Sequence, residues 1–427
     1  MNLEYFVKAL ELNKKPGFSD SSLRNRIFEI LNQLLKSRDS VFIQLKERQN
    51  EFFELVYLLI SYSEVNELWW WTNEEISKVA QECLMYASQA YCNENNEKQG
   101  YFLETVFERV YNSKITSSFS DSSRVIVNDK IKYKTSQDLY TDNPSWKTAN
   151  LNSVSSAVWF LKNLNSRFLD SVYLEFVPTV STLLEDYEIK FKLVGLEMTR
   201  VICNRVELGK IKSNGVQNLF LNIVEKLLVV RREKGGQLLL TESVNTYITM
   251  ILKFYEKSSS EYIEKLYTLF FTAIIQNFMY AGDEFSFQIA IFENINPIVE
   301  HLGVHTVRYL STLVKEFQMV LEMDIYGTEV VVELMISVSK SFIKIIDACW
   351  PRIHVYIEPI LGSLVLCYIS ISKPENKSIK QMPDLKKLLY QIYTSTTMVD
   401  KEKSSEFINL MTKEYPQLAK DLKIISV

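Results

Sequence analysis

The chain has 427 residues, of which 47% are apolar and 12% aromatic, enough for a hydrophobic core spread over two or three domains or an extended array. Its 48 basic and 52 acidic residues leave a net charge of −4, which argues against nucleic-acid binding, because phosphate contacts call for a basic excess. With only 11 glycines and 9 prolines, the tight turns of a sheet-rich fold are disfavoured, and we expect long helices with short connections.

The five cysteines are scattered and lack the spacing of metal ligands, so we expect reduced, buried thiols in a cytosolic or nuclear protein. Residues 1–5 lack the charged and apolar regions of a signal peptide. The longest run without charged residues, 266–282, is shorter than the about 20 residues of a membrane-spanning helix. We interpret it as a core helix and expect no membrane association.

Apolar residues in the N-terminal part recur at steps of three and four, the spacing of amphipathic helices that bury one stripe. One series consists of Leu23, Ile27, Phe28, Ile30, Leu31, Leu34 and Leu35, and a second of Phe52, Leu55, Val56, Leu59 and Ile60. A third series begins at Val79. Thr72 and Glu75 precede it with the spacing of a capping box, which predicts a helix start there.

Three consecutive tryptophans, 69–71, precede this helix start. They are either an exposed aromatic anchor for a partner or rings that close the groove between two helices. The second interpretation is favoured, because large aromatic side chains are mostly buried.

A long polar stretch interrupts the helical pattern between residues 113 and 151. Connections of this length are usually functional or disordered. We therefore predict an N-terminal helical region (1–113), a polar linker (114–150) and a C-terminal helical region (151–427). A small hairpin around Asn128 is a weaker possibility for the linker, and its serine-rich tract, 117–123, is a candidate but disfavoured phosphorylation segment.

After the linker, helices of about 15 to 20 residues follow one another with short connections, which is typical of antiparallel pairs stacked into an α-solenoid. We expect an all-α fold of this class. The predicted helices are 153–163, 166–184, 187–206, 212–230, 239–257, 260–281, 286–301, 304–323, 328–347, 351–372, 383–396 and 403–422.

One helix pair has a sharper signature. Pro178 lies inside its first helix, Asp186 follows that helix, and Lys192 and Gly195 lie in the second. This pattern resembles the HEAT repeat. The resemblance implies that the proline kinks the first helix, that the aspartate and a basic residue form a polar ladder, and that the small residue lets the second helix pack closely. Pro297 and Arg308, with Val307 and Ser311, resemble a degenerate second copy.

Catalytic and metal-binding patterns are scarce. The chain has three histidines, and His301 and His305 have the spacing of two zinc ligands on one helix face. Gly303 separates them, however, and a third ligand is missing nearby, so we favour two partly exposed histidines at a helical junction. The sequence contains no phosphate-binding loop, dinucleotide fingerprint or nucleophile elbow. We expect neither enzymatic activity nor a cofactor.

The most distinctive local stretch, 347–359, contains Trp350, Pro351 and Arg352, followed by His354 and Glu358. Pro351 fits the first position of a helix, where its missing amide costs nothing. Tryptophan and arginine often anchor interfaces, so these side chains are candidate partner-binding residues. The alternative, a buried Trp350 with Arg352 tied to a carboxylate, has equal weight.

The Cys-Trp-Pro-Arg-Ile stretch in an all-helical chain of this length resembles the second Tel-two-interacting protein family, the smallest subunit of the Triple-T co-chaperone complex. Residues 143–147 resemble a Pro-Trp-Lys element of that family, and the resemblance covers mainly the chain from about 146 onward. It implies a HEAT-like scaffold that binds the large helical-repeat subunit. Together with the Tel-two subunit, it would support phosphatidylinositol-3-kinase-related kinases through the ninety-kilodalton heat-shock chaperone, in cytoplasm and nucleus.

Two rivals stay open. A HEAT-type adaptor in transport or trafficking would bind a different partner but would use the same kind of helical-repeat surface. An all-helical enzyme would be favoured by a pocket that gathers Arg352, His354 and Glu358 around a small molecule.

Overall fold

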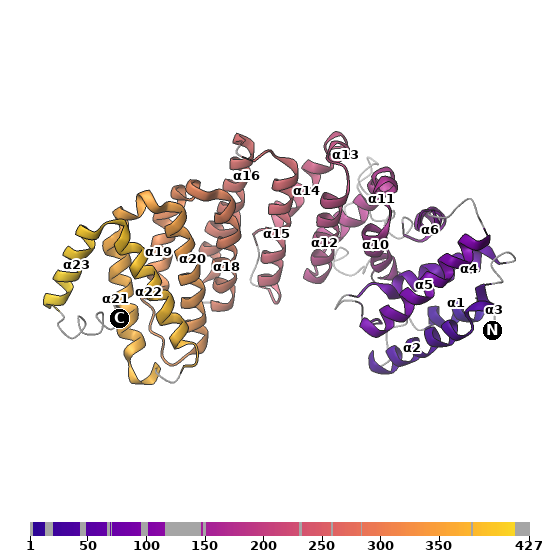
Figure 1. The fold of residues 1–427 in the computed structure, drawn as a ribbon, viewed down its shortest axis with the longest axis horizontal. Coiled ribbons are helices and arrows are strands. Elements are labelled where there is room, and N and C mark those ends of the chain that lie inside the picture. Colours follow the sequence, from indigo (N-terminus) through magenta and orange to yellow (C-terminus); the bar gives the residue numbers. More distant parts are fainter. Residues whose placement is uncertain are drawn as a thin grey trace, which may run out of the picture. The chain divides into compact units, whose positions relative to one another are not determined.

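In its described residues the computed structural model of the chain is helical, and the all-α expectation is confirmed (Figure 1). The structure describes residues 3–12, 20–42, 48–65, 69, 71–94, 101–115, 147, 151–229, 233–257, 259–282, 284–376 and 379–414, and these contain no strand. The chain divides into two compact units, Met1–Ile223 and Val224–Val427.

Unit 1 contains the helices α1 (Leu3–Leu12), α2 (Asp20–Lys36), α3 (Arg38–Phe42), α4 (Gln49–Ser63), α5 (Glu74–Glu94), α6 (Phe102–Val106), η3 (Phe107–Ile115), α10 (Leu151–Asn163), α11 (Ser166–Leu184), α12 (Ile189–Arg205), α13 (Leu208–Ser213) and the first part of α14 (Val216–Leu227). The central element is α4, which packs against α1, α5 and α10. Its sequence is apolar around most of the helix, and such helices are stable only when surrounded by other elements.

The two helical regions predicted on either side of the polar linker pack together within unit 1. The Tyr57 hydroxyl of α4 lies 3.2 Å from that of Ser153 in α10. The ring of Phe107 in η3 contacts those of Phe160 and Phe176, with centroids 5.4 and 5.5 Å apart. The predicted limits at 113 and 151 therefore do not coincide with the limit of a compact unit, which falls after residue 223. The hairpin and serine tract predicted within 114–150 lie outside the described residues.

Unit 2 contains α15 (Gly236–Phe254), α16 (Ser260–Phe270), η5 (Phe271–Ile275), α17 (Gln276–Ala281), α18 (Phe285–Leu302), η6 (Gly303–Tyr309), α19 (Leu310–Leu321), α20 (Glu329–Ile353), η7 (His354–Tyr356), α21 (Ile357–Ser372), η8 (Pro374–Asn376), α22 (Met382–Val399) and α23 (Lys401–Glu414).

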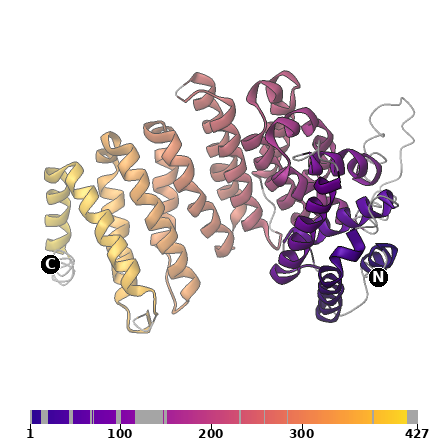
Figure 2. The same ribbon diagram turned by 45° about the vertical axis from the view of Figure 1, so that its right-hand side comes forward.

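The long helices of unit 2 form two rows. In one row α20 packs against α18 on one side and against α22 on the other, and in the second row α19 packs against α21 (Figure 2). The rings of Phe317 in α19 and Phe342 in α20 stack with centroids 3.8 Å apart and join the rows. Repeated helix pairs with shared apolar faces are the arrangement expected of an α-solenoid.

The stretch Glu329–Ser372 is long and apolar enough to cross a membrane by length and composition alone. Half of its most apolar window is buried inside the protein. The run 266–282, interpreted as a core helix, spans α16, η5 and α17, where Leu266, Phe270 and Ile274 are buried.

The helix starting after the tryptophans begins at Glu74, and its cap differs from the predicted one. The Asn73 side chain accepts a hydrogen bond of 2.8 Å from the backbone N–H of Ile76. Thr72, the predicted cap, is buried and donates instead to the carbonyl of Tyr62. Trp69 and Trp71 are buried with ring centroids 5.4 Å apart, so these two rings belong to the core and are not an exposed anchor.

Candidate partner-binding surfaces

The HEAT-like signature falls on α11 and α12. Pro178 lies on the exposed side of α11, where its missing N–H leaves the carbonyl of Leu174 without its helical donor. Gly195 lies in α12 against Leu184 of α11, and a Cβ atom at Gly195 would come within 2.9 Å of the Leu184 side chain and 3.0 Å of its backbone nitrogen. Only glycine fits at this crossing, which brings the two helix backbones close together.

The cation that pairs with Asp186 is Lys147 and not the predicted Lys192. Lys147 Nζ lies 2.7 Å from Asp186 Oδ1 and 3.0 Å from Glu188 Oε1, and both the lysine and the aspartate side chains are less than a tenth exposed. Within the described part of the chain, the half-buried Lys192 makes no ion pair with Asp186. Lys192 is the fourth residue of α12, whereas Asp186 lies in the connection before this helix.

Aromatic rings complete the surroundings of Lys147. Its ammonium group lies 3.9 Å from the ring centroid of Tyr187 and 4.9 Å from that of Phe191, distances at which the ring face attracts a cation. Burial opposes the positive charge, but the hydrogen bonds to Asp186 and Glu188 outweigh it and raise the pKa of Lys147. The ammonium is therefore held in its charged form at the turn between α11 and α12.

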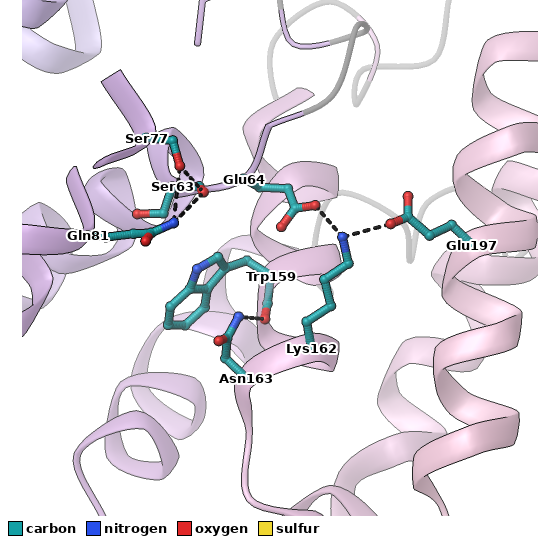
Figure 3. A network of polar contacts seen from close by, with 8 residues as sticks. All are labelled: Ser63, Glu64, Ser77, Gln81, Trp159, Lys162, Asn163 and Glu197. Atoms are coloured by element: carbon teal, nitrogen blue, oxygen red, sulfur yellow. Dashed lines mark hydrogen bonds and ion pairs between the residues drawn. The ribbon is translucent and has the colours of Figure 1, made fainter. Parts of the chain in front are cut away.

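A second polar network joins the N-terminal helices to the first helix pairs of unit 1 (Figure 3). Lys162 of α10 lies 2.5 Å from Glu64, which follows α4, and 2.7 Å from Glu197 of α12. Burial raises the pKa of Glu64, and the hydrogen bond from Lys162 counteracts part of that rise. Three elements distant in sequence are thus held by one lysine, and periodicity alone gave no signal for this contact.

On the other side of Trp159 in Figure 3, the Gln81 side chain donates to the carbonyl of Ser63 and to the hydroxyl of Ser77. Asn163 donates to the carbonyl of Trp159. These bonds satisfy polar groups beside the buried ring, and the bond from Gln81 to Ser63 holds the end of α4 against α5. They stabilise packing and present no reactive group.

The proposed second HEAT copy lies in unit 2. Pro297 is inside α18, and Arg308 belongs to η6. The Arg308 guanidinium lies 4.7 Å from the ring centroid of Tyr267 in α16, so it contacts an aromatic face. His305 is exposed and lies 3.3 Å from the Tyr267 hydroxyl, whereas His301 is half-buried. Among the described residues no group of three His, Cys, Asp or Glu side chains is placed to hold a metal ion.

The predicted helix start at Pro351 is wrong, because α20 continues to Ile353 and Pro351 lies in its last turn. A proline there lacks the N–H that would bond to the carbonyl of Asp347, and the helix ends within three residues. His354 then begins a single turn, η7. The ring Nδ1 of His354 lies 3.0 Å from the carbonyl oxygen of Pro351.

The end of α20 presents apolar and cationic side chains to solvent. Trp350 is 44% exposed and Val355 52% exposed, and Arg352 is exposed without an ion pair to any described residue. Lys403 of α23 pairs instead with Glu358, at 3.6 Å, and donates to the carbonyl of His354. We call Trp350, Arg352 and Val355 the α20 corner. The structure therefore favours exposed Trp350 and Arg352 side chains over a buried Trp350 with Arg352 tied to a carboxylate.

The residues required by the enzyme rival do not form a common site. Arg352, His354 and Glu358 are all exposed, and Glu358 contacts Lys403 rather than either of the other two. Four of the five cysteines are buried, and burial raises the thiol pKa of Cys83 and Cys367 to about 12. Such thiols are poor nucleophiles.

Comparison with known families decides the affiliation. The model of the Tti2 family matches residues 55–324, more than half of the chain. The chain belongs to the Tti2 family. This is the second Tel-two-interacting protein family, and membership supports a role as a subunit of the Triple-T co-chaperone complex. A search of curated proteins found no match.

The matched segment runs from α4 to the loop after α19. It therefore includes the Lys147 and Lys162 networks and both HEAT-like signatures, but ends before the α20 corner. The resemblance noted in the sequence rested mainly on the stretch around the α20 corner and covered the chain from about residue 146. The family match begins about 90 residues earlier.

Proposed function

We propose that this Tti2 family member is a non-enzymatic scaffold subunit of a Triple-T complex that binds the large helical-repeat subunit through its exposed helical surface. With the Tel-two subunit it supports maturation and stability of phosphatidylinositol-3-kinase-related kinases, and newly made kinase is handed to the ninety-kilodalton heat-shock chaperone system, an indirect partner. The observation that carries the proposal is the family match over 55–324. We also propose that it acts in both cytoplasm and nucleus, where fluorescence microscopy of the tagged chain can locate it.

The α20 corner is the proposed contact with the large subunit. An exposed tryptophan beside an arginine that makes no ion pair with any described residue is the kind of pair that dominates interfaces, because the ring supplies area and the guanidinium supplies a directed charge. Removing both side chains leaves the core intact, since neither is buried. Binding can therefore be separated from folding.

Affinity purification of the intact chain tests the function. The wild type should recover the large helical-repeat subunit, whereas Trp350→Ala/Arg352→Ala should lose most of it. A matched control, Met319→Ala/Lys315→Ala, removes an exposed apolar and an exposed cationic side chain from α19 and should recover the subunit normally. Equal recovery by both variants would remove the corner from the interface. Failure of the wild type, with a transport or trafficking partner recovered instead, would favour the alternative adaptor role.

A further inference from the structure

A groove of about 500 Å³ lies between α20 and α22. The two helices run in the same direction. Before they begin, Gly327 donates to the Asn376 side chain at 2.9 Å, and after they end, Lys403 donates to the carbonyl of His354. The groove is therefore lined by two parallel helices that are fixed to each other at both ends.

The charges along the groove have an order. Glu333 and Asp384 line it toward the N-terminal ends of the helices, and Lys340 and Lys387 line it further along. Between them, Ile336 and Leu388 are half-buried and supply an apolar floor. In the described part of the chain none of the four charged side chains makes an ion pair. Asp384 lies in the first turn of α22, where the helix dipole favours it, but the two lysines lack such support.

Gln381 supplies an independent sign of a missing partner. Its side-chain oxygen, Oε1, is buried at the groove and accepts no hydrogen bond from any described residue. A buried acceptor without a donor costs about 1–3 kcal/mol. A ligand that fills the groove with a free N–H would remove that cost. Extended polypeptide has free backbone N–H groups, whereas the interior of a helix has used them for its own hydrogen bonds.

We propose that the groove between α20 and α22 binds an extended segment of the large helical-repeat partner, and this inference rests on the proposed function. A backbone N–H of the segment donates to Gln381, a basic side chain lies near Glu333 and Asp384, and an acidic one lies near Lys340 and Lys387. Glu333 and Lys340 are seven residues apart, which is about 10 Å along a helix. Extended chain covers that distance in about two to four residues, with an apolar side chain between the charges.

Charge reversal tests the groove with the full-length chain and the purified large subunit. Lys340→Glu/Lys387→Glu should weaken binding at least tenfold. The matched control, Lys344→Glu/Lys386→Glu, changes net charge equally on exposed positions of the same two helices and should bind within twofold of wild type. Gln381→Leu, which keeps the size but removes the acceptor, should also weaken binding. Thermal melting of each variant checks that the fold is kept.

The outcomes separate the groove from the function. If the wild type binds the subunit and the groove variant binds equally well, the groove inference is overturned and the proposed function stands. If the wild type does not bind at all, both are overturned. A photocrosslinking residue at Leu388 should capture a partner segment with a basic and an acidic residue within about four positions. Capture of a regular helical face would contradict the extended segment.

Discussion

Lys147 and Asp186 form a nearly buried ion pair in unit 1, with 2.7 Å between Nζ and Oδ1. The pair joins a lysine that precedes α10 to the turn between α11 and α12. It takes the place that the HEAT resemblance gave to Lys192.

Replacement of Lys147 by Met should destabilise the chain by about 3 kcal/mol, because it leaves the buried carboxylate of Asp186 without its cation. Lys192→Met is the matched control and should change stability by less than about 0.5 kcal/mol, since Lys192 lacks this contact. Urea unfolding followed by circular dichroism measures both. Equal effects of the two substitutions would show that Lys192 contributes as much as Lys147.

The effect of Lys147→Met should depend on pH. Burial alone would raise the pKa of Glu188, but hydrogen bonds from Lys190 and Lys147 outweigh burial and hold that pKa below its ordinary value of 4.5. A carboxylate with a lowered folded-state pKa contributes stability above its unfolded-state pKa and loses it as the pH falls. The stability difference between wild type and Lys147→Met should therefore be largest at neutral pH and shrink below about pH 4.5. Unfolding curves of both proteins between about pH 3 and pH 7 measure this difference in stability. A difference that stays constant over the range would show that Lys147 does not stabilise the ionised form of Glu188.

Gly195→Ala should destabilise the chain by about 2 kcal/mol, because the added methyl group would overlap the side chain and backbone of Leu184. Gly362→Ala provides a control at another helical glycine, where an added Cβ meets nothing within 4 Å. It should be neutral or stabilising by up to about 1 kcal/mol, since alanine favours helix. Thermal melting compares the two. If Gly195→Ala leaves the melting temperature unchanged, α11 and α12 can move apart without loss of stability.

Glu64 and Lys162 should be energetically coupled. A double-mutant cycle with Glu64→Gln and Lys162→Met should give a coupling of about 1 kcal/mol, reduced from that of a buried pair because Lys162 is about a third exposed. The exposed pair Asp324–Lys373 serves as a comparison and should show no measurable coupling. Absence of coupling at Glu64 would mean that this ion pair does not contribute to joining the end of α4 to α10.

The positions of most helices in the C-terminal region were predictable, because each buries a stripe of apolar residues at steps of three and four. The predicted helix 166–184 coincides with α11, and 260–281 coincides with the continuous run from α16 to α17. Helix ends were less predictable. Asn73 replaced Thr72 as a cap, and Pro351 closes a helix rather than opening one, since several nearby residues satisfy the same local rules.

Some candidate site residues were predictable from the sequence and others were not. Exposure of Trp350 and Arg352 was one of two equally weighted alternatives, because a tryptophan at a helix end fits either a core or a surface. The groove between α20 and α22 had no sequence signal, since Lys340 and Gln381 are 41 residues apart in the chain.

The sequence by itself determined the all-α fold class, the near-neutral charge and the family resemblance, because these depend on composition, periodicity and local motifs. The tertiary structure alone decided which cation meets Asp186, how the N-terminal helices join the first helix pairs, and which polar groups of α20 and α22 share a groove. These contacts join residues distant in the chain. Several lysines and carboxylates are chemically equivalent in the sequence, and only packing brings particular ones within hydrogen-bonding distance.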